Sequence, residues 1–228
     1  MTGAFDAYTK LLRERPALAD NPEGGIQVIV ERAAAERIAA TMAERFAAQG
    51  LPRDWARVGI MYEDPYIVLL REAVVFPDGQ PGLYHRVIAR HDEPTGVAVL
   101  ARYDGRLVLI RHFRHPSRHW HLEIPRGAVG AGEDPARVAQ LEISEEIGGT
   151  LRSVERLGLL HGATALMRHS VVLMYGELAA IGTPALGEGI AEIRLVGASE
   201  FETMIRDGAI TDAFTVAGFF HARLRGFV

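Results

Sequence analysis

The chain contains no cysteine among its 228 residues. This absence excludes disulfides, thiolate metal ligands and a cysteine nucleophile, and it weakly favours a reducing compartment. Basic residues are also outnumbered, with 25 Lys and Arg against 29 Asp and Glu, which gives a formal net charge of −4. Since this balance lacks the basic footprint of a nucleic-acid-binding domain, we expect no nucleic-acid partner.

Long hydrophobic runs are missing as well. No stretch approaches the roughly 20 apolar residues that a membrane span needs, and residues 1–16 lack the apolar segment of a signal peptide. We therefore expect a cytoplasmic protein without a membrane partner. Its 48% hydrophobic and 24% charged content is typical of a globular protein, and its length predicts one to two domains.

Turn signals and apolar periodicity divide the chain into three regions. Residues 1–56 are expected to form an N-terminal helical extension, because two helical patterns there are separated by the breaker sequence ADNPEGG. Residues 57–92 show the alternation of strands. Residues 93–228 combine further strands, a hairpin turn at Asp104-Gly105, one internal helix and two terminal helices. This pattern predicts the α/β class, with helices packed on a mixed sheet.

Residues 127–149 are rich in glycine and glutamate. Asp134 is expected to cap a helix that starts with Pro135. Gly148 is expected to end that helix in a left-handed conformation. The predicted helix therefore runs over roughly 135–147.

Three glutamates lie within this helix. Glu142 and Glu146 flank the apolar stripe one turn apart, and Glu145 lies beyond them. Like charges at such spacing cost a few tenths of a kcal/mol, and a bound magnesium ion would remove this repulsion. The alternative is a solvated acidic face, which is common on surface helices.

The glycines and glutamates of this stretch form a defined pattern of positions, namely Gly127, Glu133, Glu142, Glu145, Glu146 and Gly148. This spacing resembles the Nudix box of the Nudix hydrolases. The family has arginine directly before the first helical glutamate, where this chain has Leu141. The resemblance implies a Nudix α/β/α sandwich with a mixed sheet, here preceded by the helical extension.

Three further segments resemble the ADP-ribose pyrophosphatase branch of this family. They are the basic-aromatic element Arg111–Arg114, the lead Trp120–Pro125 into the box, and the closing segment Gly208–Ala213. The resemblance covers about residues 57–228, so the helical extension lies outside it.

The resemblance implies a magnesium site, for which Mn²⁺ is a second candidate ion. Its expected ligands are Glu142, Glu146 and the main-chain carbonyl of Arg126, and Glu145 is either a third ligand or orients bound water. Either Glu145 or Glu188 would accept the proton of the attacking water, and the sequence does not choose between them.

The expected substrate contacts are mainly basic. Arg111 and Arg114 belong to a basic segment suited to capture of a diphosphate. The side chain of Arg126 could reach a substrate phosphate. Glu123 is either a substrate contact or the ion-pair partner of an arginine. The histidines at 112–121 match no zinc-binding spacing, so a zinc site is disfavoured.

The branch commonly exchanges its N-terminal strands, which implies a homodimer in which residues 57–92 help build the partner's pocket. Tyr66 or Arg86 would then contact the base or ribose. The expected reaction cleaves a nucleoside diphosphate derivative, such as ADP-ribose or a nucleotide sugar, into a nucleoside monophosphate and a phosphorylated remainder. The alternative is a degenerate Nudix module that binds a nucleotide without efficient hydrolysis, which Leu141 and an acid-free stretch at 161–169 favour.

Leu141 also carries a structural expectation. On a helical wheel it lies beside Val138 and Glu145, away from the apolar stripe. We therefore expect the N-terminal helices or the loop containing Glu188 to cover this face. Glu145 would then lie in a drier environment, which raises the pKa of a carboxyl group.

Overall fold

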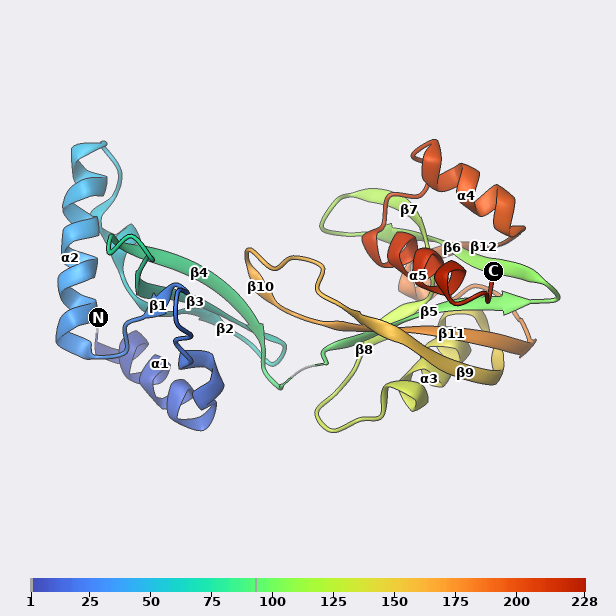
Figure 1. The fold of residues 1–228 in the computed structure, drawn as a ribbon, viewed down its shortest axis with the longest axis horizontal. Coiled ribbons are helices and arrows are strands. Elements are labelled where there is room, and N and C mark those ends of the chain that lie inside the picture. The colour runs from blue at the N-terminus through green and yellow to red at the C-terminus, as the bar shows by residue number, and fades with distance from the viewer. Residues whose placement is uncertain (1, 93) are drawn as a thin grey trace. The chain divides into compact units, whose positions relative to one another are not determined.

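The computed structural model describes residues 2–92 and 94–228, which form two compact units (Figure 1). Unit 1 comprises the chain up to Arg90 together with Ala163–Arg168, and unit 2 comprises His91–Gly162 and His169–Val228. The expected helical extension and the strands that follow it therefore share one unit. Residue 93, where the Nudix domain was expected to begin, lies outside the described residues.

Unit 1 packs helices on an antiparallel sheet that is extended by one parallel strand. Its helices are α1 (Thr2–Glu14), η1 (Pro16–Ala19), α2 (Arg32–Ala48) and η2 (Arg53–Ala56). Its strands are β1 (Gln27–Val28), β2 (Gly59–Glu63), β3 (Ile67–Val75), β4 (Pro81–Ala89) and β10 (Met167–Arg168). They lie in the order β1-β3-β4-β10, with β2 also paired to β3.

A buried polar network ties α1 to the sheet of unit 1. The Tyr8 hydroxyl donates to Glu72 Oε1 at 2.8 Å, and the Arg86 guanidinium donates to the same oxygen and to the main-chain oxygen of Leu18. Burial, reinforced by the Glu72 carboxylate, raises the pKa of Tyr8 well above its usual range. The network therefore gives the buried Tyr8 hydroxyl a hydrogen-bond partner, which the surrounding apolar core could not supply.

Unit 2 is built on a mixed sheet in the order β12-β6-β5-β11-β9, with β7 beside β6 and β8 beside β5. Its strands are β5 (Gly96–Tyr103), β6 (Arg106–Arg114), β7 (His119–Glu123), β8 (Arg126–Ala128), β9 (Thr150–Leu160), β11 (Val171–Ala180) and β12 (Ile190–Val196). Its helices are α3 (Pro135–Ile147), η3 (Leu186–Glu188), α4 (Ala198–Arg206) and α5 (Ala213–Leu224). Strands β5 and β11 are parallel, whereas the other pairs are antiparallel.

Helices cover both faces of this sheet (Figure 1). On one face α3 buries Ala139, Ile143 and Ile147 in a cluster with β5, β6 and β11. On the other face α4 and α5 bury Phe201 and Phe219, whose rings stack at 4.7 Å. Unit 2 is thus the expected α/β/α sandwich with a mixed sheet, and α1 and α2 confirm a helical N-terminal region.

The hairpin turn expected at Asp104-Gly105 is confirmed. Both residues have positive φ angles, 47° and 76°, and Tyr103 pairs with Arg106 across the turn. Two consecutive positive φ angles are the requirement of the tight turn that matches strand twist, and aspartate followed by glycine meets it.

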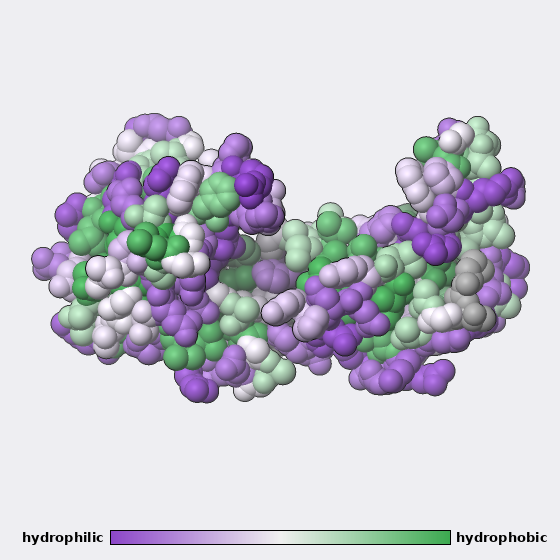
Figure 2. All heavy atoms as spheres, turned by 180° about the vertical axis from the view of Figure 1, so that it is seen from behind, coloured by the Kyte–Doolittle hydropathy of each residue, from purple (hydrophilic) through white to green (hydrophobic). Residues whose placement is uncertain are grey.

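Figure 2 shows one face of each unit, on which hydrophilic and hydrophobic residues are intermixed. Across residues 2–92 and 94–228, no helix is both long enough and apolar enough to cross a membrane.

Candidate active site

Helix α3 has the predicted bounds and both predicted ends. The Asp134 side chain accepts a hydrogen bond from the Ala136 amide, Pro135 is the first helical residue, and Gly148 ends the helix at φ 60°. Glu133 closes the preceding loop by accepting a hydrogen bond from the Gly130 amide at 2.8 Å. Packing of Ala139, Ile143 and Ile147 in the core sets the rotation of α3, so Glu142 and Glu146 face β8.

The two glutamates meet the backbone of β8 at Arg126 and Gly127. The Arg126 amide donates to Glu146 Oε2 at 3.0 Å, and Glu146 is only 2% exposed. A Cβ atom on Gly127 would lie 1.8 Å from Glu142 Oε1. Glycine at 127 therefore leaves the space that the Glu142 carboxylate occupies, and a side chain there would displace this carboxylate.

The register of β8 also orients the carbonyl of Arg126. Ladder bonds join Val99 N to Pro125 O and Val129 N to Thr95 O. Arg126, paired with Ala98, thus occupies a non-hydrogen-bonded position of the antiparallel ladder, where N–H and C=O point away from the neighbouring strand. The Arg126 carbonyl therefore opens toward the side on which its amide meets Glu146.

The pKa values of both glutamates are raised. Burial, reinforced by Glu145 and Glu188, raises the pKa of Glu142 to about 7. Burial also raises the pKa of Glu146 to about 8, against the opposing hydrogen bond from the Arg126 amide. Two crowded carboxylates beside a main-chain oxygen form the hard oxygen set that a divalent cation such as Mg²⁺ prefers.

Glu145 does not join Glu142 and Glu146 as a third converging carboxylate. Glu145 is exposed, and throughout the described ranges no three or more His, Asp or Glu side chains converge at metal-binding geometry. The histidines at 112–121 accordingly form no such group. The structure thus brings together Glu142, Glu146 and the main chain of Arg126, and leaves Glu145 and Glu188 around them.

A buried carboxylate organises the arginines of the site. Glu123 is fully buried, and it pairs with the Arg114 guanidinium and with Arg126 Nη2 at 3.2 Å. His112 Nδ1 lies 3.3 Å from Glu123 Oε1 without the geometry of a hydrogen bond. Burial alone would raise the pKa of Glu123, but His112 and the two arginines outweigh burial and hold this pKa at about 2. Glu123 is therefore a charged anchor that holds both guanidinium groups.

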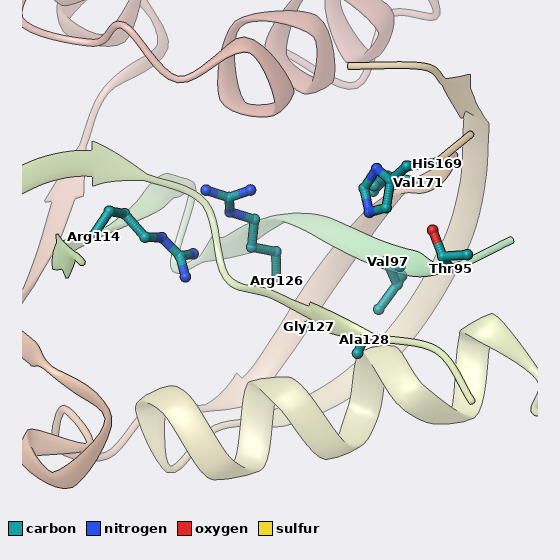
Figure 3. A pocket seen from close by; sticks show the side chains of 9 residues that line it. Thr95, Val97, Arg114, Arg126, Gly127, Ala128, His169 and Val171 are labelled. Atoms are coloured by element: carbon teal, nitrogen blue, oxygen red, sulfur yellow. The ribbon is translucent and has the colours of Figure 1, made fainter. Parts of the chain in front are cut away.

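Two hollows meet at these arginines, and both are lined by Arg114 and Arg126. One, of about 260 Å³, continues along β5 and β8 past Thr95 and His169 (Figure 3). The other, of about 330 Å³, reaches Asp212 and Ser117 near the start of α5. Figure 3 shows the Arg126 side chain extending away from α3. The site thus joins a carboxylate pair, two arginines and room for a group on either side of them.

Arg111 is not brought to this cluster. Its guanidinium stacks on Trp120 at 4.2 Å from the ring centroid. Alternate residues of a strand point to opposite faces, so Arg111 lies on the other face of β6 from Arg114. The structure therefore does not bring Arg111 to Arg114, and the predicted contact of Arg111 with the substrate stays a prediction.

The remaining predicted substrate contacts, Tyr66 and Arg86, belong to unit 1. The Tyr66 side chain is 78% exposed, whereas the Arg86 guanidinium is occupied by Glu72 and the Leu18 carbonyl. Their contact with a partner's substrate stays a prediction.

Within unit 2 the structure does not show the expected cover over Leu141. Leu141 is 40% exposed and Glu145 is exposed, whereas Val138 is buried with the apolar stripe. Unit 2 therefore does not provide the drier environment expected for Glu145, and cover by the N-terminal helices of unit 1 stays a prediction. Strand β8 packs against Glu142 and Glu146, and burial raises the pKa values of these two glutamates.

Asp212 is a site residue for which the sequence reasoning proposed no role. Its Oδ2 caps α5 by accepting from the Thr215 amide at 2.9 Å, and its Oδ1 lies 3.4 Å from Arg126 Nη2. Phe214 supports the same guanidinium, whose carbon lies 5.1 Å from the ring centroid. An aspartate preceding an apolar helical run signals the cap, but no sequence signal shows that it meets Arg126.

Known proteins resemble this chain in sequence and in fold. The NUDIX domain family matches residues 92–214. The chain is 34% identical to an ADP-ribose pyrophosphatase of Bacillus subtilis (strain 168) over 98 residues, which is 42% of this chain and 51% of that protein. It is 26% identical over 163 residues to a CMP-5'-(N-acetyl-N-hydroxy-3-aminopropyl)phosphonate hydrolase of Streptomyces rubellomurinus (strain ATCC 31215), covering 70% of this chain and 76% of that protein.

A solved structure, described as an ADP compounds hydrolase, shares the fold with a TM-score of 0.64 and 18% identity, over 75% of this chain and 95% of that one. The chain spans about half the length of its Bacillus subtilis relative. Since the family match covers more than half of the chain and includes the whole glycine- and glutamate-rich stretch, the chain belongs to the NUDIX domain family.

Proposed function

We propose that this protein is a divalent-metal-dependent pyrophosphohydrolase. Its substrate would be a nucleoside diphosphate linked to another group, with ADP-ribose or a nucleotide sugar as the leading candidates. The products would be a nucleoside monophosphate and a phosphorylated remainder. The observation that carries this proposal is the pair of the buried Glu146 and the half-buried Glu142, which lies against the same short strand that presents Arg126.

Glu142, Glu146 and the Arg126 carbonyl would hold Mg²⁺, and Mn²⁺ is the second candidate ion. When bound, the cation supplies charge neutralisation and a water of lowered pKa. Arg114 and Arg126 would bind the non-bridging oxygens of the diphosphate, because guanidinium groups suit phosphate geometry. Glu123 and Asp212 position these guanidinium groups, which lowers the entropy lost on binding.

The attacking water must give its proton to an acceptor close to Glu142 and Glu146. Glu145 and Glu188 both lie close enough to raise the pKa of Glu142, and both are exposed to solvent. Each therefore meets the requirement of proximity, and both stay in the proposal as candidates for the general base.

The homodimer with Tyr66 and Arg86 in the partner's pocket, and the cytoplasmic location, belong to the same proposal. The alternative function is a nucleotide-binding module without efficient turnover, which Leu141 favours. Fully active monomers in light scattering at micromolar concentration would rule out the dimer.

The function is tested with a panel of ADP-ribose, ADP-glucose, a dinucleoside polyphosphate and NADH in the presence of Mg²⁺. Released phosphate is read after phosphatase treatment. We expect turnover of at least one diphosphate, near-complete loss in Glu142→Gln and Glu146→Gln, and no change in Glu155→Gln, which removes an exposed carboxylate from β9. Nucleotide binding without hydrolysis would establish the alternative instead.

A further inference from the structure

The loop at residues 181–189 connects β11 to β12 and carries Glu188. It is fastened to the last turn of α3 by two main-chain bonds, from Gly182 N to Ile147 O and from Ala185 N to Glu146 O, both at 2.9 Å. The last carbonyls of a helix have no partner within the helix. The loop therefore satisfies carbonyl groups of the turn that carries Glu146.

The same place contains a close crossing of two glycines. Gly148 needs its positive φ of 60° to end the helix. Gly182 has no such requirement, yet a Cβ atom there would lie 3.0 Å from Gly148 O and 3.2 Å from Gly148 Cα. Glycine at 182 is thus explained by the close approach of the backbones at Gly182 and Gly148, and not by the φ angle of Gly182.

The far end of the loop is anchored as well. Phe113 N donates to Gly189 O at 2.9 Å, and Ile190 pairs with His112 of β6. Within the loop, the side chains of Ile181 and Ala185 pack against the core beneath α3. The segment Leu186–Glu188 is exposed and lies between the anchored residues Ala185 and Gly189, so these anchors set the position of Glu188.

We infer that the crossing of Gly148 and Gly182 is a positioning element that sets the distance between the Glu188 carboxylate and the Glu142–Glu146 pair. This inference rests on the proposed function, because the pair must be a cation site for the distance to matter. Moving Glu188 outward lowers the negative potential at the pair and weakens its hold on a divalent cation.

The test measures Mn²⁺ binding to the full chain by electron paramagnetic resonance, without any substrate. The probing variants are Gly182→Ala and the bulkier Gly182→Val. The matched control is Gly187→Ala in the same loop, where an added Cβ meets nothing within 4 Å. Neither glycine has a positive φ, so alanine is tolerated by the backbone at both positions.

We expect Glu188→Gln to weaken Mn²⁺ binding about three- to tenfold, because one charge is lost near the ion. Gly182→Ala should weaken binding about twofold and Gly182→Val more, whereas Gly187→Ala leaves it unchanged. Combined with Glu188→Gln, Gly182→Ala should add nothing further, because the group that it displaces has lost its charge.

Two failures remain distinguishable. If Gly182→Ala binds Mn²⁺ as Gly187→Ala does, or keeps its full effect in the Glu188→Gln background, the positioning inference is overturned while the metal site stands. If Glu142→Gln leaves Mn²⁺ binding unchanged, the metal site itself is absent, and the proposed function falls with it.

Discussion

Replacing Glu146 with glutamine should make the metal-free protein more stable at alkaline pH. Glu146 is buried beside Glu142, and its pKa is raised to about 8. Ionisation of this group therefore opposes folding. Glutamine is close in volume, and its Oε1 still accepts the hydrogen bond from the Arg126 amide.

The size of the gain follows from the pKa difference between the folded and unfolded states. A pKa raised from 4.5 to about 8 corresponds to about 5 kcal/mol above both values. This is an upper bound, since relaxation and water penetration screen buried charges, and roughly 1–3 kcal/mol is expected. Because the folded-state pKa is the higher one, wild-type stability falls as pH rises from about 4.5 to about 8. The advantage of the variant should accordingly be small near pH 5 and largest above pH 8.

The assay is urea unfolding in EDTA at several pH values. Trp55 lies in unit 1 and Trp120 in unit 2, and these are the two tryptophans of the chain. A Trp55→Phe background thus makes fluorescence report on unit 2 alone. Glu145→Gln is the matched control, because it removes an exposed carboxylate from the same helix and should change stability by less than about 0.5 kcal/mol.

Saturating Mg²⁺ should reverse the order of stabilities. A ligand at about 1,000 times its dissociation constant stabilises the folded state by about 4.1 kcal/mol, which exceeds the expected gain of the variant, and only the wild type keeps the site. The reasoning would be refuted by equal stabilities of wild type and Glu146→Gln at pH 8 in EDTA. A gain in Glu145→Gln as large as in Glu146→Gln would refute it too.

Three further predictions concern other parts of the molecule. Glu123→Gln should destabilise unit 2 by about 3 kcal/mol, because it removes the buried anion that pairs with the partly buried Arg114 and Arg126 guanidinium groups; the wild-type contribution is present above about pH 4.5 and is lost as pH falls toward 2, which acid unfolding would show. Tyr8→Phe should cost unit 1 about 1 kcal/mol by removing the 2.8 Å hydrogen bond to Glu72, with Mn²⁺ binding unchanged in the same preparation. Leu141→Arg should alter the urea midpoint by less than the equivalent of about 0.5 kcal/mol because Leu141 is 40% exposed, and a larger loss would show that its contacts matter.

The sequence by itself determined the elements whose causes are local. The bounds of α3 follow from Asp134, Pro135 and Gly148, and the β5–β6 turn follows from Asp104-Gly105. Caps and tight turns depend on the φ and ψ preferences of one or two residues and on hydrogen bonds to near neighbours. Such signals are readable without knowing what packs against them. The spacing of the box glutamates belongs to the same class, since it is one turn of a helix.

Only the tertiary structure decided which of these groups meet. Arg126 is held by Asp212, which lies 86 positions further along the chain, and Arg111 is turned to the opposite face of the sheet from Arg114. Likewise, β8 and not the neighbourhood of Leu141 determines which glutamates are buried. These outcomes depend on strand register and on close backbone approaches between distant segments. Because such contacts arise from packing over the whole domain, no local preference in the sequence encodes them.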